Sequence, residues 1–486
     1  MAHDFRRMLL SITDEGVVPA AWGRTMNRRE FLIIGAKSSS ALLASSALGC
    51  ATLPRTRRNE SAIVVGAGIA GLAAARELEA WGYRVIVLEG SRRIGGRIYT
   101  SRDLGLPVEL GASRIHGIKN NPIVPLLDET GAGYIPVDWD RLSGFETDGT
   151  PMDAQELSSV RDRITGIFLR SIFRNFGNTE DFPIEDIIQR ELKRRNFTPQ
   201  ERRVLMFGVT SAEMANASPF TEASWKYALD YDVYRGGDHF IVNGFDGVTN
   251  LLAAGLDIKT GVTVNAIDYG GGSVRVETGE GTLSADRVVV TVSVGVLKAR
   301  QIAFSPQLPQ AKEDAIDRIG MGLINKIALR FPKAFWPTDV HALAHGTDLR
   351  GEYPAFVNLS LYTGEPVLIA YVPGDFQDGL ENLSDKDAIG GAVDVLRRMY
   401  GSRVPDPLNA VRTRWGDDAF TRGAFTFNKV GATGRDRDTL AEPVAGRLFF
   451  AGEATSRKRF GSVSGAYLSG IRAAQEITAL PDPIIA

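Results

Sequence analysis

The sequence has very few residues of the types that form covalent crosslinks or metal centres. Its 486 residues include one cysteine, Cys50, so no disulfide can form within the chain. It has five histidines and no Cys/His cluster that predicts a metal site. His341 and His345 lack a third ligand nearby and are interpreted as surface or packing residues. The formal net charge is only −2, so no basic face for nucleic acid is expected.

Long apolar runs are also missing. The N-terminal stretch Ala41–Leu48 is apolar but too short to span a membrane. It follows Met26–Leu32, MNRREFL, which resembles a twin-arginine export signal, and it precedes Cys50. We therefore predict an exported protein, either periplasmic or anchored to the membrane as a lipoprotein through Cys50. The alternative for Cys50 is a chance cysteine in a signal cleaved elsewhere.

Glycine is abundant, with 52 residues, and three of these form a G-x-G-x-x-G motif in a specific context. The apolar run Ala62–Val65 predicts a buried strand, and Ile69–Trp81 predicts a helix after the glycines. Gly66 permits the tight turn, Gly68 lets a pyrophosphate approach the backbone, and Gly71 lets helix and strand pack closely. The N-terminal amides of such a helix favour phosphate.

A second strand and an acidic residue complete this unit. Arg84–Leu88 predicts the strand, and Glu89 after it can accept hydrogen bonds from ribose hydroxyls. Gly95-Gly96-Arg97 follows, where two glycines bring backbone close to a ligand and Arg97 can neutralise a diphosphate. The unit therefore predicts a dinucleotide site of the FAD type. The residues predicted to contact the cofactor here are Gly66, Ala67, Gly68, Ile69, Gly71, Glu89, Gly95, Gly96 and Arg97.

The rest of the chain alternates between strands and helices, which predicts an α/β fold of two or three domains. Helices are expected over Ser158–Phe176 and Pro183–Arg195, and a capping box at Thr198 starts another. Strands are expected over Leu256–Tyr269 and Lys326–Phe331. We assign residues 1–60 to signal, extension and linker, 61–130, 236–298 and 411–486 to a discontinuous FAD domain, and 131–235 and 299–410 to a substrate domain.

Seven further segments carry a resemblance that runs from about Ala62 to Ile477. They are VELGASRIHG (108–117), EMANASPF (213–220), VNGFDGVTNLLA (242–253), TVSVGVLK (291–298), MGLINKIALRF (321–331), RWGDDAFTRGAF (414–425) and LFFAGEATSRKRFGSVSGAYLSGIRAA (448–474). With them the chain resembles the flavin-containing amine oxidase family, in the branch of plant-type polyamine oxidases and lysine-specific histone demethylases. The resemblance implies a two-domain α/β flavoprotein with a discontinuous Rossmann-like FAD-binding domain and a mixed α+β substrate domain.

The resemblance also implies roles for individual residues. Lys326 would hold a water beside flavin N5, and a lysine in a dry site has a readily lowered pKa. His116 would lie over the pocket mouth, with a structural histidine as the alternative. Trp415 and Phe420 would pack near flavin and substrate, with core packing as the alternative. The remaining residues expected to contact the cofactor are Gly111, Ala112, Ser113, Arg114, Val264, Gly452, Glu453, Ser462 and Val463.

The chain departs from the family pattern at three positions. Arg459, followed by Phe460, stands where the family has an aromatic residue in the substrate pocket. Arg114 replaces a tryptophan, and Ser91 replaces an arginine. Two arginines near the cavity suit an amine that carries a carboxylate.

The predicted function is FAD-dependent oxidation of a C–N bond in a small amine or polyamine, with O₂ reduced to H₂O₂. FAD is expected to be noncovalent, because Ala454 and Ser456 occupy the segment in which a linking cysteine would lie. An L-amino-acid oxidase and an FAD amine dehydrogenase with another acceptor are alternatives. A non-catalytic, flavin-binding regulatory protein is an alternative of another class, which Lys326 and Glu453 disfavour.

Overall fold

The computed structural model describes residues 60–153, 166, 180–228, 230–373 and 376–480. The predictions made for the twin-arginine motif, for Cys50 and for a helix over Ser158–Phe176 therefore lie outside the described residues, apart from Gly166. Within the described part of the chain, no helix has the length and apolar character needed to cross a membrane. In the same residues, no group of three or more His, Cys, Asp or Glu side chains is arranged to bind a metal ion.

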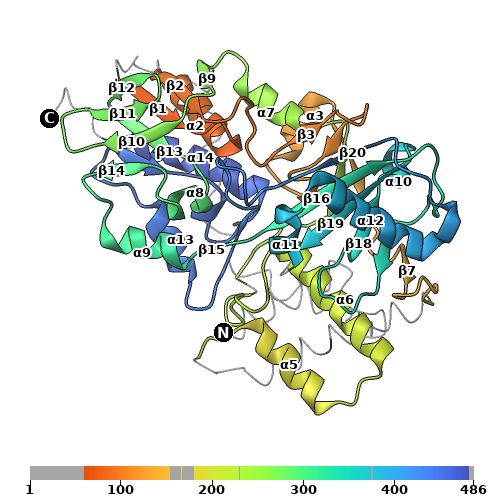
Figure 1. Ribbon diagram of the computed structural model, residues 1–486. Helices are drawn as coiled ribbons and strands as arrows, with labels where there is room; N and C mark the ends of the chain where they lie inside the picture. Colours follow the sequence, from red (N-terminus) through yellow and green to blue (C-terminus); the bar gives the residue numbers. More distant parts are fainter. Residues whose placement is uncertain (1–59, 154–165, 167–179, 229, 374–375, 481–486) are drawn as a thin grey trace, which may run out of the picture. The chain divides into compact units, whose positions relative to one another are not determined.

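A five-stranded sheet with all neighbours parallel draws its strands from distant parts of the chain (Figure 1). The valine-rich strands β1 and β13 are almost fully buried, as expected for a parallel sheet covered on both faces. Segments 61–130, 236–298 and 411–486 all contribute strands, while the domain boundaries themselves stay a prediction. The order is β22 (Leu448–Phe450), β13 (Arg287–Val290), β1 (Ser61–Val65), β2 (Arg84–Glu89) and β9 (Ile258–Thr260).

Two helices from opposite ends of the sequence pack together against this sheet. They are α2 (Ile69–Ala80) and α14 (Val463–Thr478). Small residues permit the close approach, because a Cβ on Gly470 would lie only 2.1 Å from the carbonyl oxygen of Ala70. Ser462 caps α14 by accepting a hydrogen bond from the amide of Gly465. The C-terminal helix therefore completes the unit that begins at Ser61.

A four-stranded sheet lies next to the nucleotide unit, and it corrects one prediction. The single strand expected over Leu256–Tyr269 is two strands, β9 and β10, which belong to different sheets because the chain turns at Gly261 with φ of 77°. The sheet has the order β12 (Gly281–Ala285), β11 (Val274–Thr278), β10 (Val264–Asp268) and β14 (Ala303–Ser305). The helices that accompany it are α8 (Val294–Lys298), α9 (Gln310–Arg318) and α13 (Gly434–Ala441).

A six-stranded sheet forms the core of the remaining part. Its neighbours are antiparallel except for β17 and β7, which run parallel, and α12 packs against it through buried Val393 and Leu396. The strand order is β20 (Asn409–Arg412), β16 (Ile324–Arg330), β19 (Val367–Pro373), β18 (Ala355–Asn358), β17 (Ala342–His345) and β7 (Leu142–Phe145). The helices of this part are α5 (Ile184–Arg194), α6 (Pro199–Asn216), α10 (Ser360–Thr363), α11 (Phe376–Asn382) and α12 (Asp385–Tyr400).

A small three-stranded antiparallel sheet brings predicted site residues together. It pairs β5 (Arg114–His116) with β8 (Asp238–Val242), and β8 with β6 (Gly133–Pro136). Arg114 and His116 alternate with Ile115, so they share one face of β5. The remaining short elements are β3 (Thr100–Ser101), β4 (Val108–Glu109), α3 (Val124–Thr130), α7 (Asp246–Ala253), β15 (Gly320–Met321), β21 (Thr426–Phe427) and the 3₁₀ turns Gly401–Arg403 and Glu453–Thr455.

Candidate active site

The glycine turn before α2 has the geometry of a phosphate cradle. Gly66 has a φ of 106°, and a Cβ on Gly71 would lie 2.0 Å from the carbonyl oxygen of Gly66, so both positions require glycine. A Cβ on Gly68 would meet no atom within 4 Å, which leaves open space beside the turn. No side chain caps the N-terminus of α2, and no acidic residue occupies its first turn. Its amides therefore face this space ready for an anion.

Glu89 lies beside this cradle. It is buried and accepts hydrogen bonds from the amides of Ala67, at 2.7 Å, and Ser91, at 2.8 Å. Burial raises the pKa of the Glu89 carboxyl, although both amides oppose the shift. Its carbonyl oxygen accepts from the amide of Val262, two residues before Val264, so the predicted adenine contact lies alongside. The contact with Glu89 comes from the backbone amide of Ser91, so it does not depend on the serine side chain that stands where the family has an arginine.

Phe420 is located at this end of the site. A Cβ on Gly90 would lie 2.4 Å from its ring, and the ring is 41% exposed. Phe420 therefore packs against Gly90, the residue after Glu89. The prediction that placed Phe420 in the substrate pocket is corrected. Phe420 follows a turn at Asp418, whose carboxylate accepts a hydrogen bond of 2.8 Å from the Phe420 amide. This turn directs the Phe420 ring toward Gly90 instead of the substrate pocket.

Arg97 and Glu453 meet, although 356 positions separate them in the sequence. Their ion pair is 2.7 Å long, and Glu453 also accepts from Thr426 and from the Gly461 amide, both at 2.7 Å. The fully buried Arg437 donates to Thr426 at 2.8 Å. Burial acts to raise the pKa of Glu453, but the charges of Arg97 and Arg437 outweigh burial, so the pKa is lowered and the carboxylate is charged.

Lys326 occupies the centre of the site on β16. Its ammonium donates to the carbonyl oxygens of Glu109, at 2.9 Å, and Gly111, at 2.7 Å, and to the Ser113 hydroxyl at 3.1 Å. The side chain is also 4.8 Å from the centre of the Tyr371 ring. Burial lowers the pKa of Lys326, while Tyr371 and Glu109 oppose the shift. The structure therefore brings Lys326 to two residues of the predicted segment 111–114, Gly111 and Ser113, and to Glu109 just before it.

Two residues near Lys326 were not singled out in the sequence. Tyr371 lies within 3.0 Å of the Ser113 hydroxyl, so it continues the chain of polar contacts from Lys326. Glu109 is buried and accepts from Thr100 and from the Phe245 amide, and burial raises the pKa of its carboxyl to about 7. Only the pairing of β16 with β19 reveals Tyr371, whereas Glu109 was visible as a charged residue within an apolar strand.

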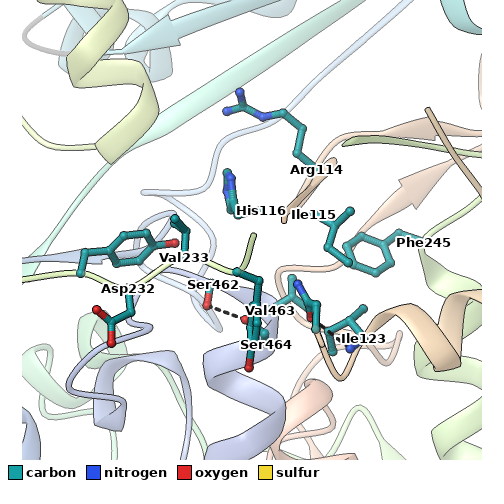
Figure 2. Close-up of a pocket in the computed structure, with 13 residues that line it drawn as sticks. Arg114, Ile115, His116, Ile123, Asp232, Val233, Phe245, Ser462, Val463 and Ser464 are labelled. Carbon is teal, nitrogen blue, oxygen red and sulfur yellow. Dashed lines mark hydrogen bonds between the residues drawn. The ribbon is translucent and has the colours of Figure 1, made fainter. Parts of the chain in front are cut away.

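A pocket begins at Arg114, the residue after Ser113, and is lined by segments around Arg114, His116, Tyr234 and Ser462–Ser464 (Figure 2). His116 Nδ1 lies 2.9 Å from Asp238 on the neighbouring strand, which fixes the imidazole. Burial acts to raise the pKa of Asp238, but the hydrogen bond and charge of His116 and the charge of Arg114 lower it. The guanidinium of Arg114 points away from Ser462 and Val463 and stacks 4.9 Å from the Trp139 ring.

The other predicted pocket residues take different positions. Trp415 is buried, and its amide donates to Asn325, the residue before Lys326. Phe460 is covered by the Arg437 guanidinium at 3.8 Å and packs edge-on against Tyr231. Arg459 stacks over Tyr234 at 4.5 Å. Of these three residues, Arg459 and Phe460 contact residues that line the pocket, Tyr234 and Tyr231, whereas Trp415 contacts the neighbour of Lys326.

These residues fit an FAD molecule. Uncapped amides at α2 and the open space at Gly68 suit a pyrophosphate, and Glu89 suits a ribose. Ser462 and Val463 at the N-terminus of α14 suit the edge of a flavin on which negative charge develops. Gly452, with φ of 122°, permits the turn that brings Glu453 to Arg97. Gly111 and Ala112 are consecutive on one loop, and cofactor contact by the residues predicted for it stays a prediction.

Comparisons with known proteins agree with this geometry. Residues 69–478 match the sequence profile of the family described as flavin containing amine oxidoreductase. Lysine-specific histone demethylase 1 homolog 2 of Arabidopsis thaliana is 37% identical over 446 residues, which cover 87% of this chain and 59% of that protein. Protein FLOWERING LOCUS D of the same plant is 36% identical over 441 residues, which cover 87% of this chain and 56% of that protein. The chain thus spans about half the length of the curated relatives it matches.

A solved structure shows the same fold. A putrescine oxidase double mutant with redesigned cofactor binding aligns with a TM-score of 0.68 and 20% identity, over 87% of this chain and 100% of that chain. The likeness confirms the predicted α/β fold of a two-domain flavoprotein. At this identity it carries no conclusion about substrate.

The prediction of export is wrong. The relatives that match most of this chain are named histone demethylases, and histones are not found in a periplasm or on an outer surface. The arginine pair in Met26–Leu32 is a short motif, and a chain with 56 lysines and arginines contains such pairs by chance. A periplasmic or lipid-anchored protein is therefore no longer expected.

Proposed function

Because the chain belongs to the family of flavin-containing amine oxidoreductases, we propose that it is an amine oxidase with noncovalently bound FAD. A small amine, O₂ and water would give a carbonyl compound, the released amine or ammonia, and H₂O₂. Bound flavin would accept the two electrons, as a hydride from the carbon next to the amine nitrogen, when the C–N bond becomes an imine.

One observation carries this proposal: Lys326 is buried among oxygen acceptors, one of which, Ser113, directly precedes the pocket residue Arg114. Its three hydrogen bonds end on two fixed carbonyls and on one hydroxyl, that of Ser113. A hydroxyl can rotate, so Lys326 can turn one N–H toward a water molecule while it keeps both carbonyl contacts. The Ser113 hydroxyl also forms a hydrogen bond of 3.0 Å with the Tyr371 hydroxyl. Lys326 would in this way hold the water that hydrolyses an imine or that assists reoxidation.

His116 and Asp238 prepare the substrate side. Asp238 holds Nδ1 of His116 at 2.9 Å, which leaves Nε2 for a substrate or a water at the pocket. A substrate amine must be neutral to lose a hydride, and a histidine so oriented can accept its proton. Apolar side chains of Ile115, Val233 and Val463 line the same pocket and exclude water from the reacting carbon.

The experiment is anaerobic mixing of the FAD-loaded protein with polyamines, monoamines, L-amino acids and a methyl-lysine peptide. Expected is bleaching of the oxidised flavin band by at least one class, followed by peroxide release when O₂ is admitted. Bleaching without peroxide would replace the oxidase by a dehydrogenase with another acceptor. Reduction by dithionite but by no amine would overturn the proposal in favour of a non-catalytic flavoprotein.

A further inference from the structure

Two acidic residues that were candidates for binding a cationic substrate are already paired with basic residues of the protein. Glu213 is buried and binds Arg350 through both oxygens, at 2.6 and 3.1 Å, and it also accepts from the Phe220 amide. Asp238 is held by His116 and lies 4.0 Å from Arg114. Both carboxylates are therefore neutralised from within the protein and are poorly suited to bind a cationic substrate.

Among the residues that the structure describes, Asp232 is the acid that lines the pocket itself. It is exposed, and its carboxylate points away from His116 and Arg114 (Figure 2). A polyamine whose reacting carbon lies near His116 would meet no inward-facing carboxylate from this residue. The pocket thus lacks the arrangement that selects a substrate with several positive charges.

Arg459 has the opposite character. Its guanidinium stacks 4.5 Å over Tyr234, a residue that lines the pocket, and its backbone carbonyl accepts from the pocket residue Ser462. The Nε atom is buried and has no hydrogen-bond partner. Within the described part of the chain, no carboxylate is paired with this guanidinium. Stacking on the tyrosine leaves the planar edge, with its fork of N–H donors, available for an anion.

Two more cations follow pocket residues in the sequence, Lys119 three positions after His116 and Arg235 directly after Tyr234, and we call this pair the rim. Lys119 and Arg235 face each other across an antiparallel bridge between the strand segments that carry His116 and Tyr234. Both are exposed, and neither has a carboxylate partner among the residues that the structure describes. A positive rim attracts an anionic group and disfavours a polycation.

We infer that the amine accepted by this site carries a carboxylate and that the Arg459 guanidinium binds it. The inference rests on the proposed amine oxidation, for which it names the substrate class. Arg114 is not the anion-binding group, because Asp238 lies 4.0 Å from its guanidinium and neutralises it. Arg459 thereby sets specificity without taking part in the chemical step.

The test compares amines that differ only by the carboxylate: L-lysine with cadaverine, and L-phenylalanine with phenethylamine. Flavin reduction by the holoenzyme should be at least about 10-fold more efficient, as rate over dissociation constant, for the carboxylate member that is accepted. Arg459→Met should remove about 10-fold for that member and less than about 3-fold for its partner. The control is Arg457→Met, at an exposed position where Asp438 pairs with the arginine at 2.8 Å. Preference for the decarboxylated members, or equal losses on both, would overturn the inference.

Binding separates this inference from the proposed function. Calorimetric titration of the holoenzyme with 3-phenylpropionate, which has a carboxylate and no amine, should show saturable binding that Arg459→Met abolishes and Arg457→Met keeps. Absence of binding to the unaltered protein would overturn the inference even if amines reduce the flavin. Binding without reduction by any amine would overturn only the amine oxidation.

Discussion

Two regions of the molecule each contain a buried lysine in nearly the same physical state. Lys326 is 5% exposed and Lys312, on α9, is 2% exposed. Each ammonium has three oxygen acceptors, and each lies over an aromatic ring, Tyr371 at 4.8 Å and Phe450 at 4.3 Å. Burial lowers the pKa of both lysines, that of Lys312 to about 7. Burial and hydrogen-bond number therefore do not distinguish a catalytic lysine from a structural one.

The difference lies in the acceptors. Lys312 donates to the carbonyl oxygens of Thr439, Leu440 and Glu442, at the C-terminal end of α13, where helical carbonyls lack partners. Lys326 donates to one rotatable hydroxyl, which continues to Tyr371 on a wall of the site. Fixed carbonyls make a helix cap, whereas a hydroxyl within a polar chain lets the lysine change partners during a reaction.

The largest expected effect is that of Lys326→Met on flavin chemistry. Reduction or reoxidation should slow about 1,000-fold, equivalent to ~4 kcal/mol of barrier, because the polar chain loses its first member. Stopped-flow absorbance on the FAD-bound variant measures both steps. Unchanged rates for both would remove Lys326 from the mechanism and erase the contrast with Lys312.

Lys312→Met should do the reverse. Three carbonyls at the end of α13 lose their donor, which should cost about 3 kcal/mol of unfolding free energy. Flavin reduction per folded, FAD-bound molecule should stay within about 2-fold, because nothing reaches the pocket from α9. Urea titration and stopped-flow on the same preparation measure the two quantities. A large loss of rate at full stability would contradict the structural assignment.

The third effect concerns pH around Lys326. Burial raises the pKa of Glu109 from 4.5 to about 7, so the folded state keeps a proton that the unfolded state releases. The unfolding free energy therefore falls as pH rises from 4.5 to 7. Glu109→Gln should abolish that fall, so between pH 4.5 and pH 8 the variant should gain about 3 kcal/mol of unfolding free energy relative to the unaltered protein. Parallel stability curves for the two proteins across this range would show that Glu109 ionises freely.

The smallest expected effect is that of Ser113→Ala. Lys326 keeps both carbonyl contacts and loses only the hydroxyl, so flavin reduction should slow about 5-fold, or ~1 kcal/mol. Thermal unfolding should change little, because Tyr371 can still interact with the lysine. A loss as large as that of Lys326→Met would mean that the hydroxyl, rather than the ammonium, is the essential group.

Local features of the site were predictable from the sequence. The unit from β1 to β2 was expected with a helix over Ile69–Trp81, and α2 ends at Ala80. The capping box at Thr198 is present with both of its hydrogen bonds. Such features depend on contacts within a few residues, where glycine conformation, capping and periodicity act directly.

Partners across the sequence were not predictable in the same way. The acceptors of Lys326 lie 213 to 217 positions away, and Tyr371 meets it only through the register of β16 with β19. Phe420 was placed with the substrate because its motif is near Trp415 in sequence, yet a turn sends it to Gly90. Residue type and spacing indicate which face of a strand is buried, but they do not tell which residue of a strand distant in the sequence lies opposite, so side-chain neighbours at the substrate end had to come from the structure.

The sheet order also constrains when the protein can acquire its cofactor during synthesis. The ribosome releases β1 and α2 hundreds of residues before β22 and α14, which cover an edge of that sheet and a face of that helix. Until β22 has emerged, β13 presents an unpaired edge, and Glu453, which follows β22, is not yet fixed beside Arg97. The nucleotide unit of a nascent chain therefore stays open until β22 and α14 have been synthesised.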